Sequence, residues 1–209
     1  MGQHIAKKIS KRKAKKLTRA FFGRPTLKVA RDLIGKVLAD TRTGEKKSAV
    51  GRFLRIVEVE AYIGEDDPAC HASVGPTERN RVMYGSAGFA YVYLIYGMYH
   101  CLNFVTERKG YPAAVLIRAG EPLERGIQES GGALLSRTDG PGRLCRALGI
   151  TRSENGLDLT GDSIYVQDCG LEPRKIATGP RIGIRVGKEK NWRFFDPDSK
   201  FLSKARDSN

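Results

Sequence analysis

Hydrophobic and polar residues alternate over several short stretches of this chain, and this pattern predicts strands more often than helices. The strongest candidate is residues 53–62, FLRIVEVEAY, which are rich in β-branched residues. Residues 90–95 and 99–105 predict two strands of a β-hairpin, because Gly97 between them permits a tight turn. Four further segments carry weaker strand patterns: residues 36–41, 113–119, 163–167 and 181–186.

Helical patterns are fewer and short. Residues 17–22 predict one helix, and Thr26 is placed to cap a second that ends at Gly35. Residues 125–135 and 140–148 predict two more. Because the strands are short and hairpin-linked rather than alternating with long helices, we expect an α+β fold. Residues 64–81 form a long loop with few apolar side chains, and such loops are often functional.

The charge is unevenly distributed. The chain has 209 residues with 37 Lys and Arg against 23 Asp and Glu, a net charge of +14. Residues 1–16 hold seven cations and no acid, and therefore half of that excess. We expect this arm to be disordered in isolation, with weak phosphate contact as a secondary role, and residues 17–209 to form the folded domain. The excess of positive charge indicates a polyanionic partner, which could be DNA, RNA or anionic lipid.

Several classes of protein are disfavoured. No apolar run reaches the ~18 residues of a membrane span, and the basic N-terminus lacks the apolar core of a secretory signal. The four cysteines are scattered without a Cys-x-x-Cys pair, so we expect a reduced, cytosolic protein without a zinc ribbon or disulfide scaffold. The three histidines have no metal-ligand spacing. We expect neither a metal nor another cofactor.

Two carboxylates stand out on the strongest strand. Glu58, Glu60 and Tyr62 share strand parity, and by simple alternation Leu54 and Ile56 lie on the same face. Acids after an apolar stretch mark either a strand end that emerges into solvent or a functional site. A carboxylate in an apolar pocket can serve as a general base, and Glu60 leads directly into the long loop.

The hairpin carries a second unusual pattern. Residues 91–99 contain four of the chain's eight tyrosines. Tyrosines form strands and pack well, which is an ordinary explanation for most of them. Tyr96 and Met98, however, flank the glycine of the turn, where no core is available. A large apolar pair at that position of a basic protein suggests a wedge for nucleic acid.

Three other polar residues, taken one at a time, do not indicate a functional site. His71 lies in the long loop, where a backbone contact is its ordinary role. Asn103 and Arg118 fall on neighbouring strand candidates, where a turn hydrogen bond and a surface salt bridge would explain them.

Taken together, these segments resemble the alkyladenine (3-methyladenine) DNA glycosylase family of animals and many bacteria. A histidine follows the Glu of EAY at the eleventh position, and YVYLIYGMYHCLN comes later. The matching segments, in family order from about Leu17 to Lys204, are VEVEAYIGEDDPACHA, GPTERNRVMYGSAG, YVYLIYGMYHCLN, AAVLIRAGEPLE, GPGRLCRALGI and ATGPRIGI.

The resemblance implies a role for each matching residue. Glu60 resembles the general base that activates water for attack on C1′, and Arg118 an active-site arginine that contacts the phosphate of the flipped nucleotide. The base pocket would consist of the walls Tyr62, His71 and Tyr93, the backbone groups of Ala69 and His71, and Asn103, which crowds the 2-amino position of guanine. Tyr96, with Met98 beside it, would intercalate where the base leaves the stack.

The resemblance also implies a single domain with a curved, mostly antiparallel sheet, surrounding helices and a protruding hairpin, like a formyltransferase C-terminal domain. We expect a monomer without membrane contact that acts on damaged double-stranded DNA. Its location would be cytoplasmic, at the nucleoid of a prokaryote or in the nucleus of a eukaryote. Because no lysine matches a catalytic position, we expect a monofunctional enzyme that leaves an abasic site. Tyrosine faces favour cations by roughly 0.5–2 kcal/mol, so cationic alkylpurines should be preferred over neutral bases.

Two departures and two alternatives accompany this interpretation. Residues 107–111 lengthen one segment, and Cys70 replaces a common serine before His71. The alternatives are a catalytically silent relative that only grips DNA or RNA, and a ribosome-associated basic protein. Glu60 argues against the first, and the hairpin turn with the Glu58–Glu60 pair argues against the second.

Overall fold

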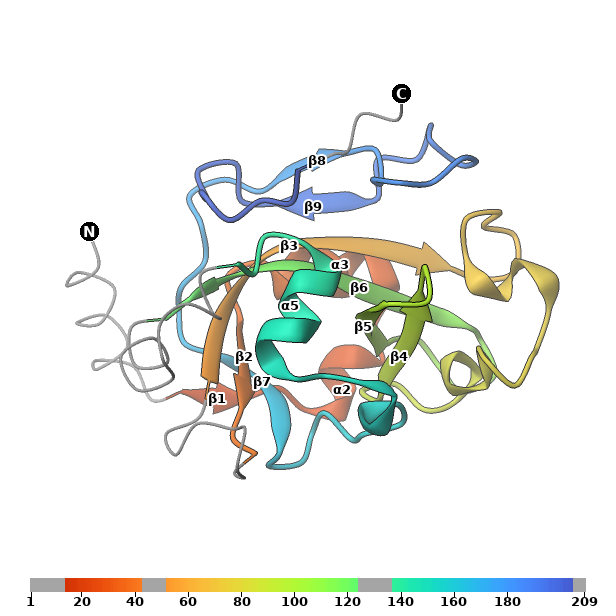
Figure 1. The fold of residues 1–209 in the computed structure, drawn as a ribbon, viewed down its shortest axis with the longest axis horizontal. Helices are drawn as coiled ribbons and strands as arrows, with labels where there is room; N and C mark the ends of the chain where they lie inside the picture. Colours follow the sequence, from red (N-terminus) through yellow and green to blue (C-terminus); the bar gives the residue numbers. More distant parts are fainter. Residues whose placement is uncertain (1–13, 43–51, 124–136, 205–209) are drawn as a thin grey trace.

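The long strand β3 (Arg52–Ile63) lies at the centre of one nine-stranded antiparallel sheet (Figure 1). The computed structural model describes residues 14–42, 52–123 and 137–204. Along the main path of the sheet the strands follow the order β1-β7-β2-β3-β6-β5-β4, and β9 joins the edge of β3 that β2 leaves. The expected α+β class is therefore confirmed, whereas the likeness to a formyltransferase C-terminal domain stays a prediction.

The remaining strands are short except β5 and β6. They are β1 (Lys15–Lys16), β2 (Val37–Asp40), β4 (Ala90–Ile95), β5 (Tyr99–Val105), β6 (Ala113–Pro122), β7 (Ile164–Asp168), β8 (Ala177–Gly179) and β9 (Arg193–Phe195). The helices are α2 (Arg19–Phe22), α3 (Thr26–Leu33) and α5 (Pro141–Leu148), with 3-10 turns η1 (His71–Val74), η2 (Arg81–Tyr84) and η3 (Arg152–Glu154). Strand β9 and its partner β8 form a ribbon above β3 in Figure 1.

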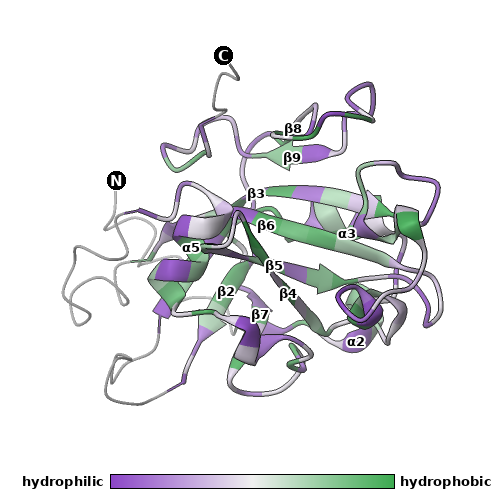
Figure 2. Ribbon diagram, turned by 45° about the vertical axis from the view of Figure 1, so that its right-hand side comes forward, coloured by the Kyte–Doolittle hydropathy of each residue, from purple (hydrophilic) through white to green (hydrophobic). Residues whose placement is uncertain are grey.

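The core is built where helices α3 and α5 meet the sheet. Helix α3 packs against β3 and β6, and α5 packs against β5 and β6. Apolar residues follow these strands (Figure 2), and Phe22 meets Phe104 edge to face with ring centroids 5.9 Å apart. Full burial of one such large side chain contributes about 1.5–3 kcal/mol.

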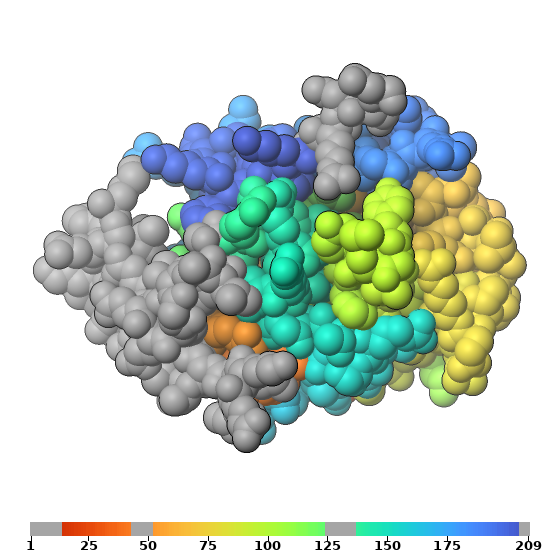
Figure 3. Space-filling view, viewed as in Figure 1, coloured from red at the N-terminus to blue at the C-terminus, as the bar shows by residue number. Residues whose placement is uncertain are grey.

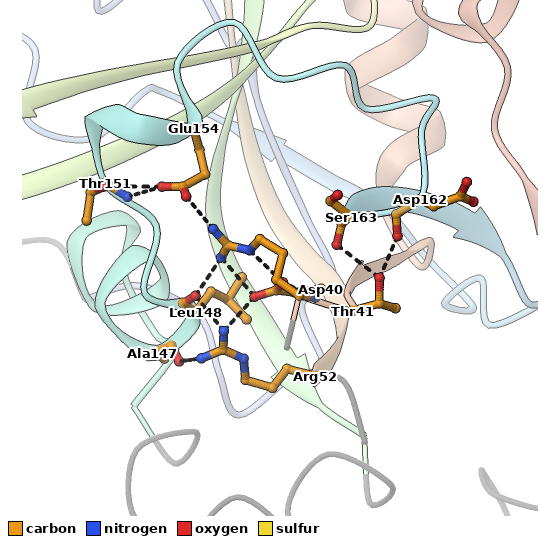
Figure 4. A network of polar contacts seen from close by, with 10 residues as sticks. Asp40, Thr41, Arg52, Ala147, Leu148, Thr151, Glu154, Asp162 and Ser163 are labelled. Atoms are coloured by element: carbon orange, nitrogen blue, oxygen red, sulfur yellow. Dashed lines mark hydrogen bonds and ion pairs between the residues drawn. The ribbon is translucent and has the colours of Figure 1, made fainter. Parts of the chain in front are cut away.

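An ionic network fixes the C-terminal end of α5 (Figure 4). Arg52 donates to the carbonyls of Ala147 and Leu148 at 2.9 and 2.8 Å, and to Asp40 at 2.6 Å. Arg42 bonds to Asp40, to Glu154 and to the Leu148 carbonyl. These cations satisfy carbonyls that the helix leaves unpaired and oppose the negative end of its dipole. They thereby fix the helix whose first turn lines the cleft described below.

The sequence pattern located most elements correctly. The hairpin strands match residue for residue, and the strands predicted at 36–41, 53–62, 113–119 and 163–167 are all present. Helices at 17–22 and 140–148 are confirmed as the shorter α2 and α5. The helix predicted at 125–135 lies outside the described residues.

Three expectations were wrong or incomplete. Lys15 and Lys16, placed in the arm, pair with β7, while residues 1–13 lie outside the described part of the chain. Thr26 is not the cap of α3, because Pro25 holds that position and Glu107 accepts from the Thr26 N–H and hydroxyl at 2.6 and 2.9 Å. Residues 181–186 form no strand, since the Ile182 N–H donates to a carboxylate instead of a sheet partner.

Candidate active site

A cleft of about 2090 Å³ opens between the β4–β5 hairpin, strand β6, helix α5 and the C-terminal segment. In Figure 3 the hairpin stands beside α5 and the blue C-terminal segment. Seven of the nine predicted site residues line this cleft: Tyr62, Ala69, His71, Tyr93, Tyr96, Asn103 and Arg118. Residues more than 50 positions apart in sequence therefore meet here, as the resemblance implied.

Three aromatic rings, His71, Tyr91 and Tyr93, form a packed cluster along one side of the cleft. His71 lies edge to face with Tyr93, with centroids 4.4 Å apart, and its Nδ1 is 2.8 Å from the Tyr91 hydroxyl. Burial, and after it the charge of Arg79, lowers the pKa of His71 to about 4, so the ring is neutral at pH 7. The cluster therefore presents a rigid, uncharged aromatic surface.

Asn103 on β5 is held by the backbone next to this aromatic cluster. Its side-chain amide donates to the carbonyls of Tyr91 and Cys101 at 3.1 and 3.4 Å. The NH₂ group has two hydrogens, so these contacts commit both. The side-chain oxygen is the polar atom left to meet a bound base.

The loop that carries Ala69 and His71 is fixed from behind. Asp67 accepts from the Ala69 N–H at 3.3 Å and from two nitrogens of Arg181 at 2.5 and 2.8 Å. Asn80 donates to the His71 carbonyl at 2.8 Å. Within the described residues, the Ala69 carbonyl and the His71 N–H keep no internal partner, which leaves one acceptor and one donor in two residues that line the cleft.

Glu60 is fully buried immediately beneath the lining of the cleft. Its Oε2 accepts from the Tyr62 hydroxyl at 2.9 Å and from Arg118 Nη1 at 3.1 Å, and its Oε1 from the Ile182 N–H at 2.6 Å. All three donors belong to residues that line the cleft. Each carboxylate oxygen can accept about two hydrogen bonds. Oε1 therefore has capacity for one further donor, such as a water molecule.

Glu58 is equally buried, and it differs from Glu60 in being bound mainly by β9 and the C-terminal segment. It accepts from Arg193 Nε at 2.6 Å and from the Ser203 N–H and hydroxyl at 2.6 and 2.9 Å, and Arg118 Nε lies 3.4 Å away. Burial works to lower the pKa of Arg118, but the charges of Glu60 and Glu58 outweigh it and raise that pKa above its ordinary value. We call Glu58, Glu60 and Arg118 the floor of the cleft.

The burial of both acids excludes one of the two explanations that the sequence left open, a strand end that emerges into solvent. The pairing of β3 with β6 is irregular on both sides of Glu58. Leu54 and Ile56 share the main core with Val59, so they do not lie on the face of the two acids. The irregularity interrupts the simple alternation along β3, which had placed Leu54 and Ile56 on the same face as Glu58 and Glu60.

The hairpin tip, residues Tyr96-Gly97-Met98, lies apart from the core. Tyr96 is 76% exposed and Met98 67% exposed. Tyr96 and Gly97 both have positive φ, 53° and 68°, and a non-glycine residue with that backbone is uncommon. Met98 does not line the main cleft but an adjoining cavity of about 320 Å³ beside Tyr99 and Arg146. The tip therefore projects two apolar side chains from a strained turn.

Several residues of the site were not predicted. Ile182 reaches the floor from the segment that was wrongly predicted as a strand, and Ser203 from a segment without a strand or helix signal. Arg181 stacks over Tyr62 with its Cζ 4.7 Å from the ring centroid. Cationic residues also line the cleft: Arg137, Arg143, Arg146, Arg185, Lys188 and Lys204. The net charge of the sequence indicated such residues but not their position around the cleft.

Two features are absent from the described residues. Among the described residues no group of three His, Cys, Asp or Glu side chains is placed to hold a metal ion. In the same part of the chain, no helix is long and apolar enough to cross a bilayer.

Comparison with known proteins identifies the family. The model of the methylpurine-DNA glycosylase family matches residues 20–200. The chain belongs to this family. It is therefore a DNA glycosylase, a hydrolase of N-glycosidic bonds, and the resemblance of the sequence segments is confirmed.

Similar proteins carry a matching name. The glycosylase is 52% identical over 200 residues to a "Putative 3-methyladenine DNA glycosylase" of Methanocella arvoryzae, covering 90% of this chain and 96% of the relative. A protein of the same name from Sodalis glossinidius is 52% identical over 179 residues, covering 85% and 95%. A third, from an Anaeromyxobacter species, is 47% identical over 194 residues, covering 91% and 93%.

Proposed function

We propose that this glycosylase rotates alkylated or deaminated purines out of duplex DNA and hydrolyses their N-glycosidic bond. The substrate class comprises 3-methyladenine, 7-methylguanine, hypoxanthine and ethenoadenine. One observation carries the proposal: a buried carboxylate with one open acceptor site lies beneath an aromatic cleft, beside an exposed apolar turn. Each of these parts corresponds to a problem that a glycosylase must solve.

The first problem is access, because the reacting C1′–N bond is shielded inside the duplex. Rotating the nucleotide out costs a few kcal/mol, and least for a damaged base. Tyr96 and Met98 are exposed at the tip, where they can fill the gap that the base leaves. The cationic rim of the cleft supplies contacts for the phosphates of the strand.

The second problem is recognition of the base. The base would lie among Tyr62, His71 and Tyr93, with the Ala69 carbonyl and His71 N–H facing its edge. Asn103, fixed by two backbone carbonyls, would crowd a 2-amino group and so disfavour normal guanine. Neutral His71 avoids adding a positive charge beside an alkylated purine.

The third problem is the chemical step. As the C1′–N bond breaks, its electron pair leaves with the base and positive charge develops on the sugar. Glu60 would stabilise that charge and accept a proton from the water whose oxygen bonds to C1′. Arg118, 3.1 Å from Glu60, would orient the carboxylate and meet the phosphate of the flipped nucleotide. The products are the free base and an intact strand with an abasic site.

The test is base release under single-turnover conditions from four duplexes, each carrying one of the lesions, with an undamaged duplex as control. We expect release from damaged duplexes only, and strand breakage only after alkali. Lys188 and Lys204 line the cleft, so borohydride trapping should also be performed to detect a lysine–sugar adduct. Binding without base release would instead indicate a catalytically silent relative, and trapping would contradict the monofunctional reaction.

We also propose that the glycosylase acts as a monomer on double-stranded DNA, at the nucleoid or in the nucleus. One copy contributes every residue of the cleft described above. Light scattering of the protein bound to a lesion duplex should give a mass of one protein per duplex. A mass with two copies on a single lesion would contradict this.

A further inference from the structure

Two arginines contact the tyrosine rings that line the cleft, and they differ in how their charges are balanced. Arg181 lies over Tyr62, with Cζ 4.7 Å from the ring centroid, and Arg79 lies over Tyr93 at 5.2 Å. Arg181 is buried and paired with both oxygens of Asp67. In the described part of the chain Arg79 makes no ion pair, although its neighbour Arg81 pairs with Glu78.

Arg79 contacts the aromatic cluster from outside the cleft. Tyr93 lines the cleft, whereas Arg79 does not, so the guanidinium contacts the ring without lining the space that a bound base would occupy. Arg79 Nη2 also lies 3.4 Å from the Leu94 carbonyl, next to Tyr93 on β4. The side chain is exposed on the loop between η1 and η2.

The charge of Arg79 is felt by neighbouring rings. After burial, it is the second cause that lowers the pKa of His71 to about 4. Burial raises the pKa of Tyr91 to about 12, and Arg79 opposes that rise. A positive charge beside the aromatic cluster lowers the pKa of both His71 and Tyr91, and Arg79 acts on both in this direction.

This charge opposes the binding of a cationic base. A tyrosine face attracts a cation through its ring quadrupole. A second cation in contact with the same ring repels the first, and nothing in the described ion-pair network neutralises Arg79. A neutral base stacked at the same place experiences no such repulsion.

We propose that Arg79 is a specificity-determining residue that disfavours cationic N-alkylated purines relative to neutral lesions such as hypoxanthine. The inference rests on the proposed function, and it revises the expectation that tyrosine faces alone make cationic lesions preferred. Arg79 touches neither the lesion nor the sugar, and acts through Tyr93.

The test compares Arg79→Met with wild type in single-turnover excision of 7-methylguanine and hypoxanthine. We expect the ratio of the two efficiencies to rise about 3- to 10-fold in favour of 7-methylguanine. Arg79→Lys, which keeps the charge, should stay near the wild-type ratio. Arg81→Met removes a positive charge two residues further along, in η2, where Arg81 pairs with Glu78, and should leave the ratio unchanged.

A second measurement tests the effect of the charge of the base on binding alone, without the difference in leaving-group chemistry between the two lesions. Two duplexes carry bases of one shape, a stabilised 7-methylguanine and neutral 7-methyl-7-deazaguanine, and their dissociation constants are measured by fluorescence anisotropy. Arg79→Met should improve affinity for the cationic base relative to the neutral one about 3- to 10-fold. Arg79→Gln serves as the second variant should the Met variant prove unfolded by circular dichroism.

Other outcomes would overturn the inference. If both lesions lose efficiency equally in Arg79→Met, the residue only contacts DNA phosphate. If Arg81→Met shifts the ratio as much as Arg79→Met, the effect is general electrostatics. A wild-type protein that releases neither base would instead refute the proposed function itself, which keeps the two failures distinct.

Discussion

At the hairpin tip, Tyr96 and Met98 expose 76% and 67% of their surfaces, whereas at the floor of the cleft Glu58 and Glu60 expose none. Each arrangement reverses the ordinary placement, because apolar side chains face solvent and charged ones are buried. The tip makes few contacts with the protein, while the floor is joined to β9 and the C-terminal segment by hydrogen bonds. The tip is therefore free to contact DNA, whereas the floor depends on the fold for its charges to be tolerated.

The largest effect on stability should come from Glu58, the acid of the floor that lies beside two arginines. Glu58→Gln leaves Arg193 without its counter-charge in a buried site and leaves Arg118 with Glu60 alone, which costs about 3 kcal/mol. Urea unfolding measures the free energy. Asp162→Asn is the control, since its pair with Lys16 is at the surface and is worth about 0–1 kcal/mol. Equal losses in the two variants would remove the contrast between the floor and the surface.

Tyr96→Ser should affect DNA and leave the fold unchanged. Stacking of an aromatic side chain with a base contributes about 1–3 kcal/mol, so affinity for a duplex with an abasic-site analogue should fall about 10- to 100-fold. The melting temperature should remain at the wild-type value, because the side chain is exposed. Val74→Ser, at an exposed apolar position outside the tip, is the control. Unchanged affinity in Tyr96→Ser would exclude the wedge.

Protonation of His71 should have a smaller effect on stability, and this effect depends on pH. Its pKa is lowered from 6.5 to about 4, so the unfolded chain binds more protons in that window. The free energy of unfolding should consequently fall as pH is lowered from about 6.5 to 4. Unfolding of wild type and His71→Gln across this range measures the contribution, and the variant should show a shallower slope. Parallel slopes would show that His71 is not buried as a neutral ring.

The smallest effect concerns charge outside both regions. Residues 1–13 contain five cations, and a deletion of residues 2–13 removes them while keeping β1. The slope of log affinity against log salt for undamaged DNA should decrease by at most about 4, with base release at saturation unchanged. An identical slope would show that these charges do not meet phosphate.

The sequence predicts the tip far better than the floor. The hairpin has two alternating strands and a glycine turn, all within 16 residues, so its bounds were predicted residue for residue. The roles of Glu60 and Tyr96 came from the family segments. Ile182 and Ser203 bond to acids more than 100 residues away, and no local pattern encodes such contacts. The three-residue strands β8 and β9 are too short for a periodicity signal.

The central claim is that the buried carboxylate of Glu60 performs the chemistry while the tip and cleft bind the lesion. Its most direct test is Glu60→Gln, measured for both affinity and single-turnover release from a hypoxanthine duplex. We predict binding within about threefold of wild type and release slower by about 10²- to 10⁴-fold, the usual contribution of a general base. Release at the wild-type rate would contradict the account.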